Sequence, residues 1–266
     1  MGLFRSSLEI LAEFVNRCEQ KDSILQVGVT SLFVPPKDIV EILQKMNLVS
    51  ITDVGLQWKN NSKKIEEINK NKRLIFDSKL DQGKFVRPEF VYHALGFSEV
   101  DSVDIASHDD PTFLYDMNQP GAADSIGKQY DVVLEVGTIE HVFHVPNALW
   151  NLVSLCNVGG EIIHWAPMNN WPNHGYYQLQ PPLFFDFYQR NGFEVTEAKI
   201  IRALNDAERS HVARDYAYER SFRSPIPQDG HKYLFLCRAK KREQRDSMSM
   251  PFQGAYEDQP GWRPGV

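Results

Sequence analysis

The chain has 266 residues, of which 42% are apolar and 24% charged, and its formal net charge is -6 at pH 7. This composition can bury one large core, so we expect one domain with insertions. The negative balance argues against a surface that binds nucleic acid over the whole protein, and no apolar run approaches the ~18 residues that a membrane span needs. Three scattered cysteines without a CxxC pair predict neither a disulfide framework nor a zinc site, and they suit the reducing cytoplasm.

Residues 1–22 are predicted to form an N-terminal amphipathic helix, spanning about Leu3 to Cys18. Its apolar face consists of Leu8, Leu11, Phe14 and Val15. The first six residues also fit the N-myristoylation pattern, which is the less favoured alternative and would imply reversible membrane contact. A domain is expected to follow over residues 23–239.

The first strand of this domain is predicted from Ser23, followed by a loop that contains Gly28, Thr30 and Ser31. The chain has neither the Gly-x-Gly-x-x-Gly that opens a helix in dinucleotide-binding folds nor a P-loop. Both motifs bind phosphate groups. The sequence therefore disfavours NAD and ATP as ligands.

An insertion is expected at about residues 47–85, on the rim where substrate enters. Before it, Pro35-Pro36 starts a helix, and after it a second helix is predicted over Val86–Leu95, ending at Gly96. The stretch Lys59–Arg73 is polar and is expected to be a solvated helix or loop.

Three apolar runs between residues 100 and 170 end in polar residues. They are Ser102-Val-Asp104, then Thr112-Phe-Leu-Tyr-Asp116-Met117-Asn118, and Tyr130-Asp131-Val-Val-Leu-Glu135-Val-Gly137-Thr-Ile-Glu140-His141. A helical pattern and a Gly159-Gly160 turn come next. Short buried strands that alternate with helices predict a parallel sheet, and ligands in such sheets bind beyond the carboxyl ends of the strands.

The order of these motifs resembles a class I S-adenosylmethionine (SAM)-dependent methyltransferase, specifically a bacterial methyltransferase-like subset in which the first glycine loop is reduced. The resemblance covers roughly Ser23 to Arg238. It implies a Rossmann-like, doubly wound α/β fold with a seven-stranded, mostly parallel sheet, an antiparallel last strand and helices on both faces. It also implies SAM as the cofactor.

The resemblance assigns the cofactor to residues at the strand ends. Gly28 would approach SAM in the first loop, and Asp104 would accept hydrogen bonds from the ribose hydroxyls, although a helix N-cap is the alternative role. Asp116 and Asn118 would border the adenine, with Met117 packed on the ring, and a plain Asx turn competes for the two polar residues.

Glu135 and Gly137 would lie near the sulfonium group. For Glu135, a cofactor contact and a buried, paired charge both stay open. Asp131, at the opposite end of its strand, is expected to be structural.

Catalytic candidates are His141, His174 and Tyr176, because oxygen methylation needs a base near neutral pH and a positioned acceptor. For His141, a hydrogen bond at a helix start is the favoured alternative. His174 and Tyr176 lie in an aromatic, polar loop that would face the acceptor or merely pack on the helix expected at Pro181–Arg190. At the strand ends the spacing offers no His-x-x-x-His and no paired Asp-Asp of the kind that holds a metal in catechol methyltransferases, so we expect no metal.

The last strands are predicted at Phe193–Ile201 and Lys232–Arg238, with a charged segment at 204–223 that is either a helix over the active site or a subunit contact. Residues 240–266 are expected to be a disordered tail. The predicted function is methyl transfer to a small-molecule acceptor, such as a sugar or another hydroxyl compound, without nucleic-acid or membrane partners; a homo-oligomer stays open. The alternative is a catalytically silent binding or assembly module.

Overall fold

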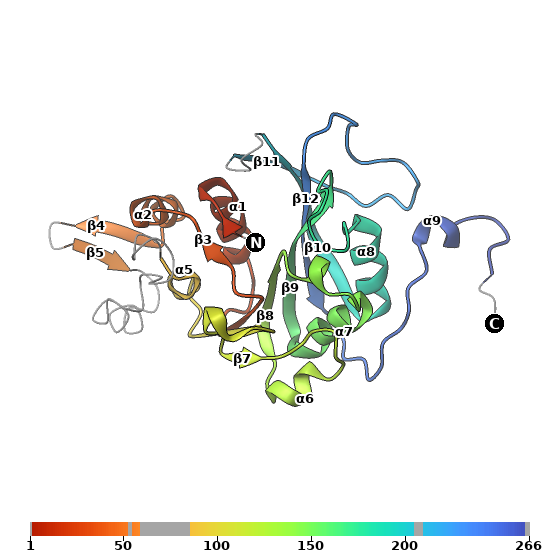
Figure 1. Cartoon of the computed structure of the whole chain (residues 1–266), viewed down its shortest axis with the longest axis horizontal. Helices are drawn as coiled ribbons and strands as arrows, with labels where there is room; N and C mark the ends of the chain where they lie inside the picture. The colour runs from red at the N-terminus through yellow and green to blue at the C-terminus, as the bar shows by residue number, and fades with distance from the viewer. Residues whose placement is uncertain (1, 53–54, 59–85, 205–209, 264–266) are drawn as a thin grey trace.

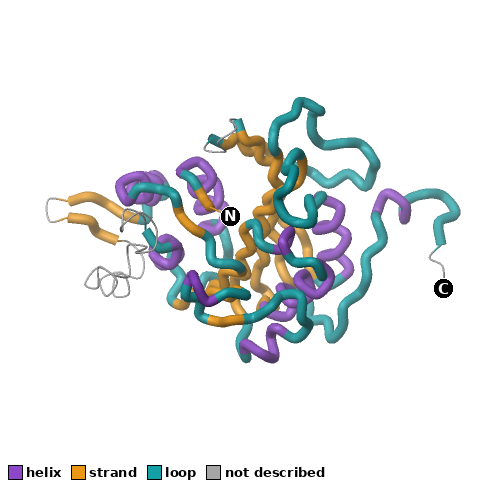
Figure 2. Tube along the Cα trace, in the orientation of Figure 1, coloured by secondary structure: helices purple, strands orange, loops and turns teal. Residues whose placement is uncertain are grey.

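The computed structural model describes residues 2–52, 55–58, 86–204 and 210–263. Their main feature is an eight-stranded sheet with helices on both faces (Figure 1 and Figure 2). In spatial order its strands are β11 (His211–Asp215), β10 (Phe193–Ala203), β12 (Tyr233–Lys241), β9 (Cys156–Asn169), β8 (Tyr130–Val136), β2 (Ser23–Val27), β6 (Glu99–Asp104) and β7 (Phe113–Leu114). The five strands from β9 to β7 pair in parallel, whereas β12 is antiparallel to both of its neighbours.

The described sheet has one strand more than the seven expected. The extra strand, β11, comes from the charged segment for which a helix was one of the two expectations. It pairs antiparallel with Lys199–Ala203 of β10. Without β11 this long strand would present a row of unpaired backbone groups at the sheet edge, which explains why the segment is extended there.

The helices form one layer on each face of the sheet. On one face lie α1 (Arg5–Asn16), α2 (Pro36–Lys45) and α5 (Pro88–Ala94), and on the other α6 (Ala122–Ile126), α7 (Val145–Leu155) and α8 (Pro181–Arg190) (Figure 1). Successive strand residues point to opposite faces, so Val132 packs with the first layer and Val133 with the second. Two apolar cores follow from this alternation.

Sequence patterns predicted five of these helices, and α6 was not predicted. All four residues of the apolar face predicted near the N-terminus are buried in α1, as the packed-helix interpretation of that segment expects. The helices α2 and α8 each begin at a proline of a Pro-Pro pair, where the missing N–H and the fixed φ fit the first turn.

Two small strand pairs lie outside the main sheet. β1 (Gly2–Leu3) pairs in parallel with β3 (Ser31–Leu32), so the chain after β2 continues extended instead of entering a helix. β4 (Val49–Thr52) and β5 (Gly55–Trp58) pair antiparallel within the predicted insertion. The polar stretch Lys59–Arg73 lies outside the described residues.

Asp131 has the structural role that we expected. Its Oδ2 accepts hydrogen bonds from the backbone N–H of Asp22 and of Ser23, at 3.0 and 3.2 Å, and its Oδ1 accepts one from Asn157 Nδ2. These bonds tie the amino ends of β2 and β8 together, at the edge of the sheet opposite the polar strand ends.

The segment after β12 was expected to be a disordered tail, but it contains the short helix α9 (Gly254–Glu257). The N–H of Gly254 donates to Asp186 on α8 at 2.9 Å. Within the described part of the chain, no helix has the length and apolar character that crossing a membrane requires.

Candidate functional site

A groove lies at the carboxyl ends of β2 and β6 and beside the loop after β7. Its cavity volume is about 120 Å³. It is lined by Val27, Gly28, Val103, Asp104, Ile105, Tyr115, Asp116, Met117, Asn118, Thr138, His141 and Val142. Five predicted cofactor residues and one predicted catalytic residue are therefore neighbours in space, and in an open α/β sheet this is where a ligand is expected.

Asp104 ends β6 and organises the loops around the groove. Its Oδ2 accepts a hydrogen bond from the backbone N–H of Val29 at 3.0 Å, and its Oδ1 accepts one from Ala106 at 3.1 Å. A carboxylate has about four lone-pair sites, so two backbone donors leave capacity for further donors from a ligand. The carboxylate thus holds the loop after β2 in place and still faces the groove.

Asp116, Met117 and Asn118 form the loop after β7. Asp116 Oδ1 accepts from the backbone N–H and the side-chain amide of Asn118, at 2.9 and 2.8 Å, and the backbone bond is the main reason that the pKa of Asp116 is lowered. Asn118 Oδ1 in turn accepts from the backbone N–H of His144 at 3.0 Å. Asp116 therefore makes the Asx turn that was the alternative, and the side chain of Asn118 binds the backbone of His144. Met117 is buried and presents apolar surface to the groove.

Gly28 has a packing reason to be glycine. Its φ is +73°, and a Cβ at this position would lie 2.1 Å from Thr138 Oγ1. That hydroxyl donates to the carbonyl of Val27 at 2.9 Å. The space that a side chain would occupy is taken by the loop after β8, so the glycine is required by the protein as well as available to a ligand.

Glu135 belongs to a buried network and does not line the groove. Its Oε1 accepts from the N–H of Thr138 at 2.6 Å and of Ile139 at 3.2 Å, and its Oε2 lies 2.9 Å from His164 Nδ1. His164 Nε2 is 2.6 Å from the Tyr188 hydroxyl. The geometry corresponds to the buried, paired charge that was one of the two roles proposed for Glu135.

Gly137 also lies outside the groove lining. It has a φ of +66°, and its N–H donates to the carbonyl of Trp165 at 2.9 Å. It shapes the turn that leads from β8 into the 3₁₀ helix η3 (Ile139–His141).

Glu140, His141 and His174 form a cluster at the end of this 3₁₀ helix. Glu140 Oε1 is 3.4 Å from His174 Nε2 and 3.8 Å from His141 Nε2, and the two rings lie 5.0 Å apart. Glu140 is fully buried, and burial raises its pKa well above the ordinary value, with a further contribution from the charge of Glu135. Burial lowers the pKa of His141, which favours a neutral imidazole.

The loop that carries His174 is attached directly to Glu140. The carbonyl of Glu140 accepts hydrogen bonds from the N–H of Tyr176 at 2.7 Å and of Tyr177 at 3.3 Å. Gly175 has a φ of +70°, and a Cβ there would lie 2.7 Å from the same carbonyl oxygen. A glycine is therefore needed for this close approach, which brings His174 to Glu140.

Tyr176 does not line the groove. Its side chain is 69% exposed and packs edge-on against Phe143, which is itself 71% exposed, at 5.8 Å between ring centroids. The neighbouring Tyr177 donates its hydroxyl hydrogen to the carbonyl of Phe143 at 2.9 Å. The aromatic loop is thus held on the η3–α7 connection, with one exposed aromatic pair beside the histidine cluster.

Six of the residues that line the groove were not predicted from the sequence, and neither was a role for Glu140. Ile105 lines the groove with an unusually exposed apolar side chain, and the only signal for it is its position directly after Asp104. Glu140 was noticed as the neighbour of His141 but was given no role, because the loop that brings His174 to it is more than thirty residues away in the sequence.

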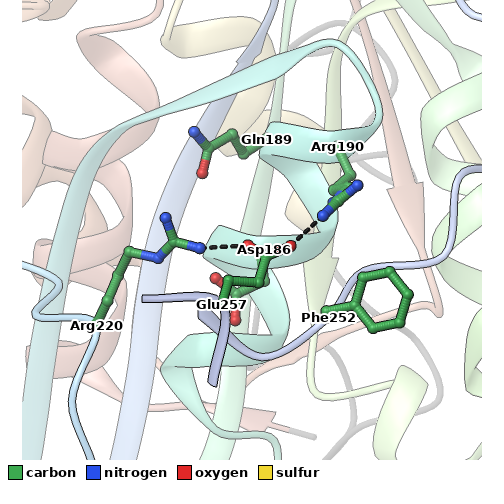
Figure 3. Close-up of a pocket in the computed structure, with 6 residues that line it drawn as sticks. All are labelled: Asp186, Gln189, Arg190, Arg220, Phe252 and Glu257. Atoms are coloured by element: carbon green, nitrogen blue, oxygen red, sulfur yellow. Dashed lines mark hydrogen bonds and ion pairs between the residues drawn. The ribbon is translucent and has the colours of Figure 1, made fainter. Parts of the chain in front are cut away.

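A second pocket, of about 220 Å³, lies between α8 and the C-terminal segment (Figure 3). Its lining residues are Asp186, Gln189, Arg190, Arg220, Phe252 and Glu257. Both arginines pair with Glu257, and Asp186 accepts from the hydroxyl of Tyr218 at 3.0 Å. The charges of this pocket are matched within the protein, so it joins the C-terminal segment to the domain.

Comparison with solved structures finds methyltransferases, all at low similarity. TehB from Haemophilus influenzae is 18% identical, with a TM-score of 0.39, and the match covers 57% of this chain and 52% of TehB, about half of its length. Magnesium protoporphyrin IX methyltransferase from Synechocystis, solved with bound SAM, is 12% identical, with a TM-score of 0.36 and coverages of 88% and 77%. An O-methyltransferase family protein from Burkholderia thailandensis is 11% identical, with a TM-score of 0.37 and coverages of 88% and 56%.

No protein-family model matches the sequence, and no curated protein matches it either. At the TM-scores and identities found, the structural similarity assigns no activity. The function has to be inferred from the residues of the groove.

Proposed function

We propose that this protein is a SAM-dependent methyltransferase that methylates a hydroxyl oxygen of a small-molecule acceptor. The observation that carries this proposal is the charge of the groove. Its described lining contains two carboxylates, Asp104 and Asp116, and neither lysine nor arginine. A phosphate-bearing nucleotide would be repelled here, whereas SAM has no phosphate and carries a positive sulfonium group.

The groove residues suit the nucleoside half of SAM. Asp104 offers acceptor capacity to the ribose hydroxyls, and charge-assisted hydrogen bonds of this kind are worth roughly 1.5–3 kcal/mol each. Met117 and Val103 present apolar surface for an aromatic base. The cavity of about 120 Å³ is smaller than the ~300–1,000 Å³ of pockets that enclose a whole ligand, so SAM would extend beyond it along the sheet edge.

The bound SAM would supply an activated methyl group to the acceptor. The protein's own contribution would be to hold the acceptor in line with that group, and such positioning can provide several kcal/mol. His141 is the candidate closest to this step, because it lines the groove and also belongs to the cluster with Glu140 and His174. Phe143 and Tyr176 form the exposed aromatic surface beside it, where an acceptor could bind.

Isothermal titration calorimetry with SAM and S-adenosylhomocysteine tests the proposal, with NAD and ATP as comparison ligands. Binding of either SAM compound at ~100 times its dissociation constant should raise the free energy of unfolding by roughly 2.7 kcal/mol. NAD or ATP binding without SAM binding would contradict the proposal.

A matched pair of variants tests the charge argument. Ile105→Lys places a cation at the groove, whereas Leu114→Lys places one on β7 outside the lining; the two native side chains are 69% and 60% exposed, so neither change disturbs the core. A like charge at the edge of a site costs on the order of 1 kcal/mol or more, and we expect Ile105→Lys to weaken SAM binding at least about fivefold. Leu114→Lys should bind normally.

The alternative function is a binding module without catalysis. It is favoured by the loop after β2, which continues into β3 and keeps a single glycine. A protein that binds SAM in the calorimeter, but transfers no methyl group to any of a panel of hydroxyl compounds, would support this alternative.

A further inference from the structure

We propose that Glu140, His141 and His174 form a binding site for one divalent transition-metal ion. No metal was expected from the sequence, because the chain lacks a short-spaced ligand motif. The structure places three ligand-bearing side chains together from two separate segments, and one ligand atom of each lies within 4.8 Å of the others.

The spacing of the ligand atoms fits a common metal ion. Zinc binds histidine nitrogen and carboxylate oxygen at about 2.0–2.2 Å, so two ligands of a tetrahedral ion are about 3.4 Å apart. Glu140 Oε1 lies 3.4 Å from His174 Nε2 and 3.8 Å from His141 Nε2. Small rotations of the two imidazole rings would complete the geometry. Two histidines and one carboxylate are a common ligand set for zinc and iron(II).

The burial of the Glu140 carboxylate also points to a bound cation. Its side chain is fully buried, and among the described residues neither carboxylate oxygen has a hydrogen-bond partner. A buried carboxylate is costly unless it is paired, protonated or bound to a metal. An ion held by Glu140 and both histidines would compensate this cost.

Backbone hydrogen bonds and ring packing hold the side chains of the cluster in place. Both Tyr176 and Tyr177 donate backbone hydrogen bonds to the Glu140 carbonyl, and Gly175 permits that contact. The ring of His174 packs against Trp171 at 5.1 Å between centroids. The histidine side chains are 49% and 30% exposed, so an ion can enter from the surface and keep open coordination positions.

The catalytic role of the ion rests on the proposed function, whereas its binding does not. His141 lines the groove, so an ion bound to it would lie beside the acceptor. A divalent ion polarises a coordinated hydroxyl group and lowers its pKa. The two histidines would then act as metal ligands and not as the bases that their residue type suggests.

Metal binding can be measured without any methyl transfer. Protein dialysed against EDTA is titrated with Zn²⁺ in a calorimeter and with Co²⁺ by visible absorption, because the d–d bands of Co²⁺ report histidine coordination. We expect one ion per chain. Glu140→Gln, His141→Asn and His174→Asn should each weaken binding by at least about tenfold, since each removes one direct ligand.

His108→Asn is the matched control, because His108 is paired with Asp109 and lies outside the cluster. It should bind Zn²⁺ as the wild type does. Glu140→Gln also controls for folding. The metal-free variant should melt no lower than metal-free wild type, because the change removes a buried charge. At one Zn²⁺ concentration, the ion should raise the melting temperature of the variant less than that of the wild type.

Absence of Zn²⁺ and Co²⁺ binding would overturn the proposal and leave Glu140 as a buried carboxyl group beside two histidines. Binding that survives all three substitutions would overturn it as well. SAM titrations of the metal-free protein separate this result from the proposed function, because the residues assigned to SAM do not include the three ligands. Zn²⁺ binding without SAM binding would contradict the proposed function alone.

Discussion

Replacing Asp104 by alanine should weaken both the fold and the binding of SAM, and the two effects can be separated. The carboxylate accepts hydrogen bonds from Val29 and Ala106, at 3.0 and 3.1 Å. Because the site is partly exposed, water can replace part of these bonds, and we expect roughly 1–3 kcal/mol lower stability. Loss of the ribose bonds should weaken SAM binding by about 10- to 100-fold, which corresponds to about 1.4–2.8 kcal/mol.

Asp131→Ala is the matched control for this experiment. Asp131 also accepts two backbone hydrogen bonds, from Asp22 and Ser23, but at the opposite ends of the strands. Urea denaturation should show a comparable loss of stability for both variants, whereas calorimetry should show weakened SAM binding for Asp104→Ala alone. If Asp104→Ala loses stability and still binds SAM with the wild-type affinity, Asp104 only organises the loop and the ribose assignment is refuted.

Three further results are expected. Gly28→Ala should lower the melting temperature, because its Cβ would lie 2.1 Å from Thr138 Oγ1 in a backbone conformation with positive φ. Thr138→Ala in the same chain should restore part of the loss. A Gly28→Ala variant with the wild-type melting temperature would contradict this packing. Tyr188→Phe removes the partner of His164 Nε2 and should cost about 1–3 kcal/mol in urea denaturation, and an unchanged midpoint would show that the buried network is not needed for stability. Iodoacetamide should modify native protein very slowly at pH 7.5, because burial raises the pKa of each cysteine thiol. In urea it should modify three thiols. Rapid labelling of native protein would disprove that burial. These cysteines are Cys18, Cys156 and Cys237.

The order of strands and helices could be predicted from the sequence because it depends on local patterns. Short segments rich in branched apolar residues mark β2 and β8, which are buried along most of their length. Pro-Pro pairs mark the starts of α2 and α8. Asp104, Asp116 and Met117 could be placed near one another for a similar reason, since the carboxyl ends of parallel strands meet at one edge of the sheet.

Side-chain partners at that edge could not be predicted, because they depend on distant segments. The carboxylate of Glu135 turns inward because His164, on the neighbouring strand β9, offers it a ring nitrogen at 2.9 Å. In the same way, nothing in the local sequence shows that Asn118 is used by the backbone of His144.

The histidine cluster shows the same division. The sequence by itself determined that Glu140 and His141 are adjacent at the end of β8 and that His174 follows β9 in a loop with a glycine. Only the tertiary structure decided that this loop hydrogen-bonds to the Glu140 carbonyl and brings His174 to the buried carboxylate. The physical reason is that strand and helix propensities act over a few neighbouring residues, whereas burial of a charge and the approach of two loops are set by the packing of the whole domain.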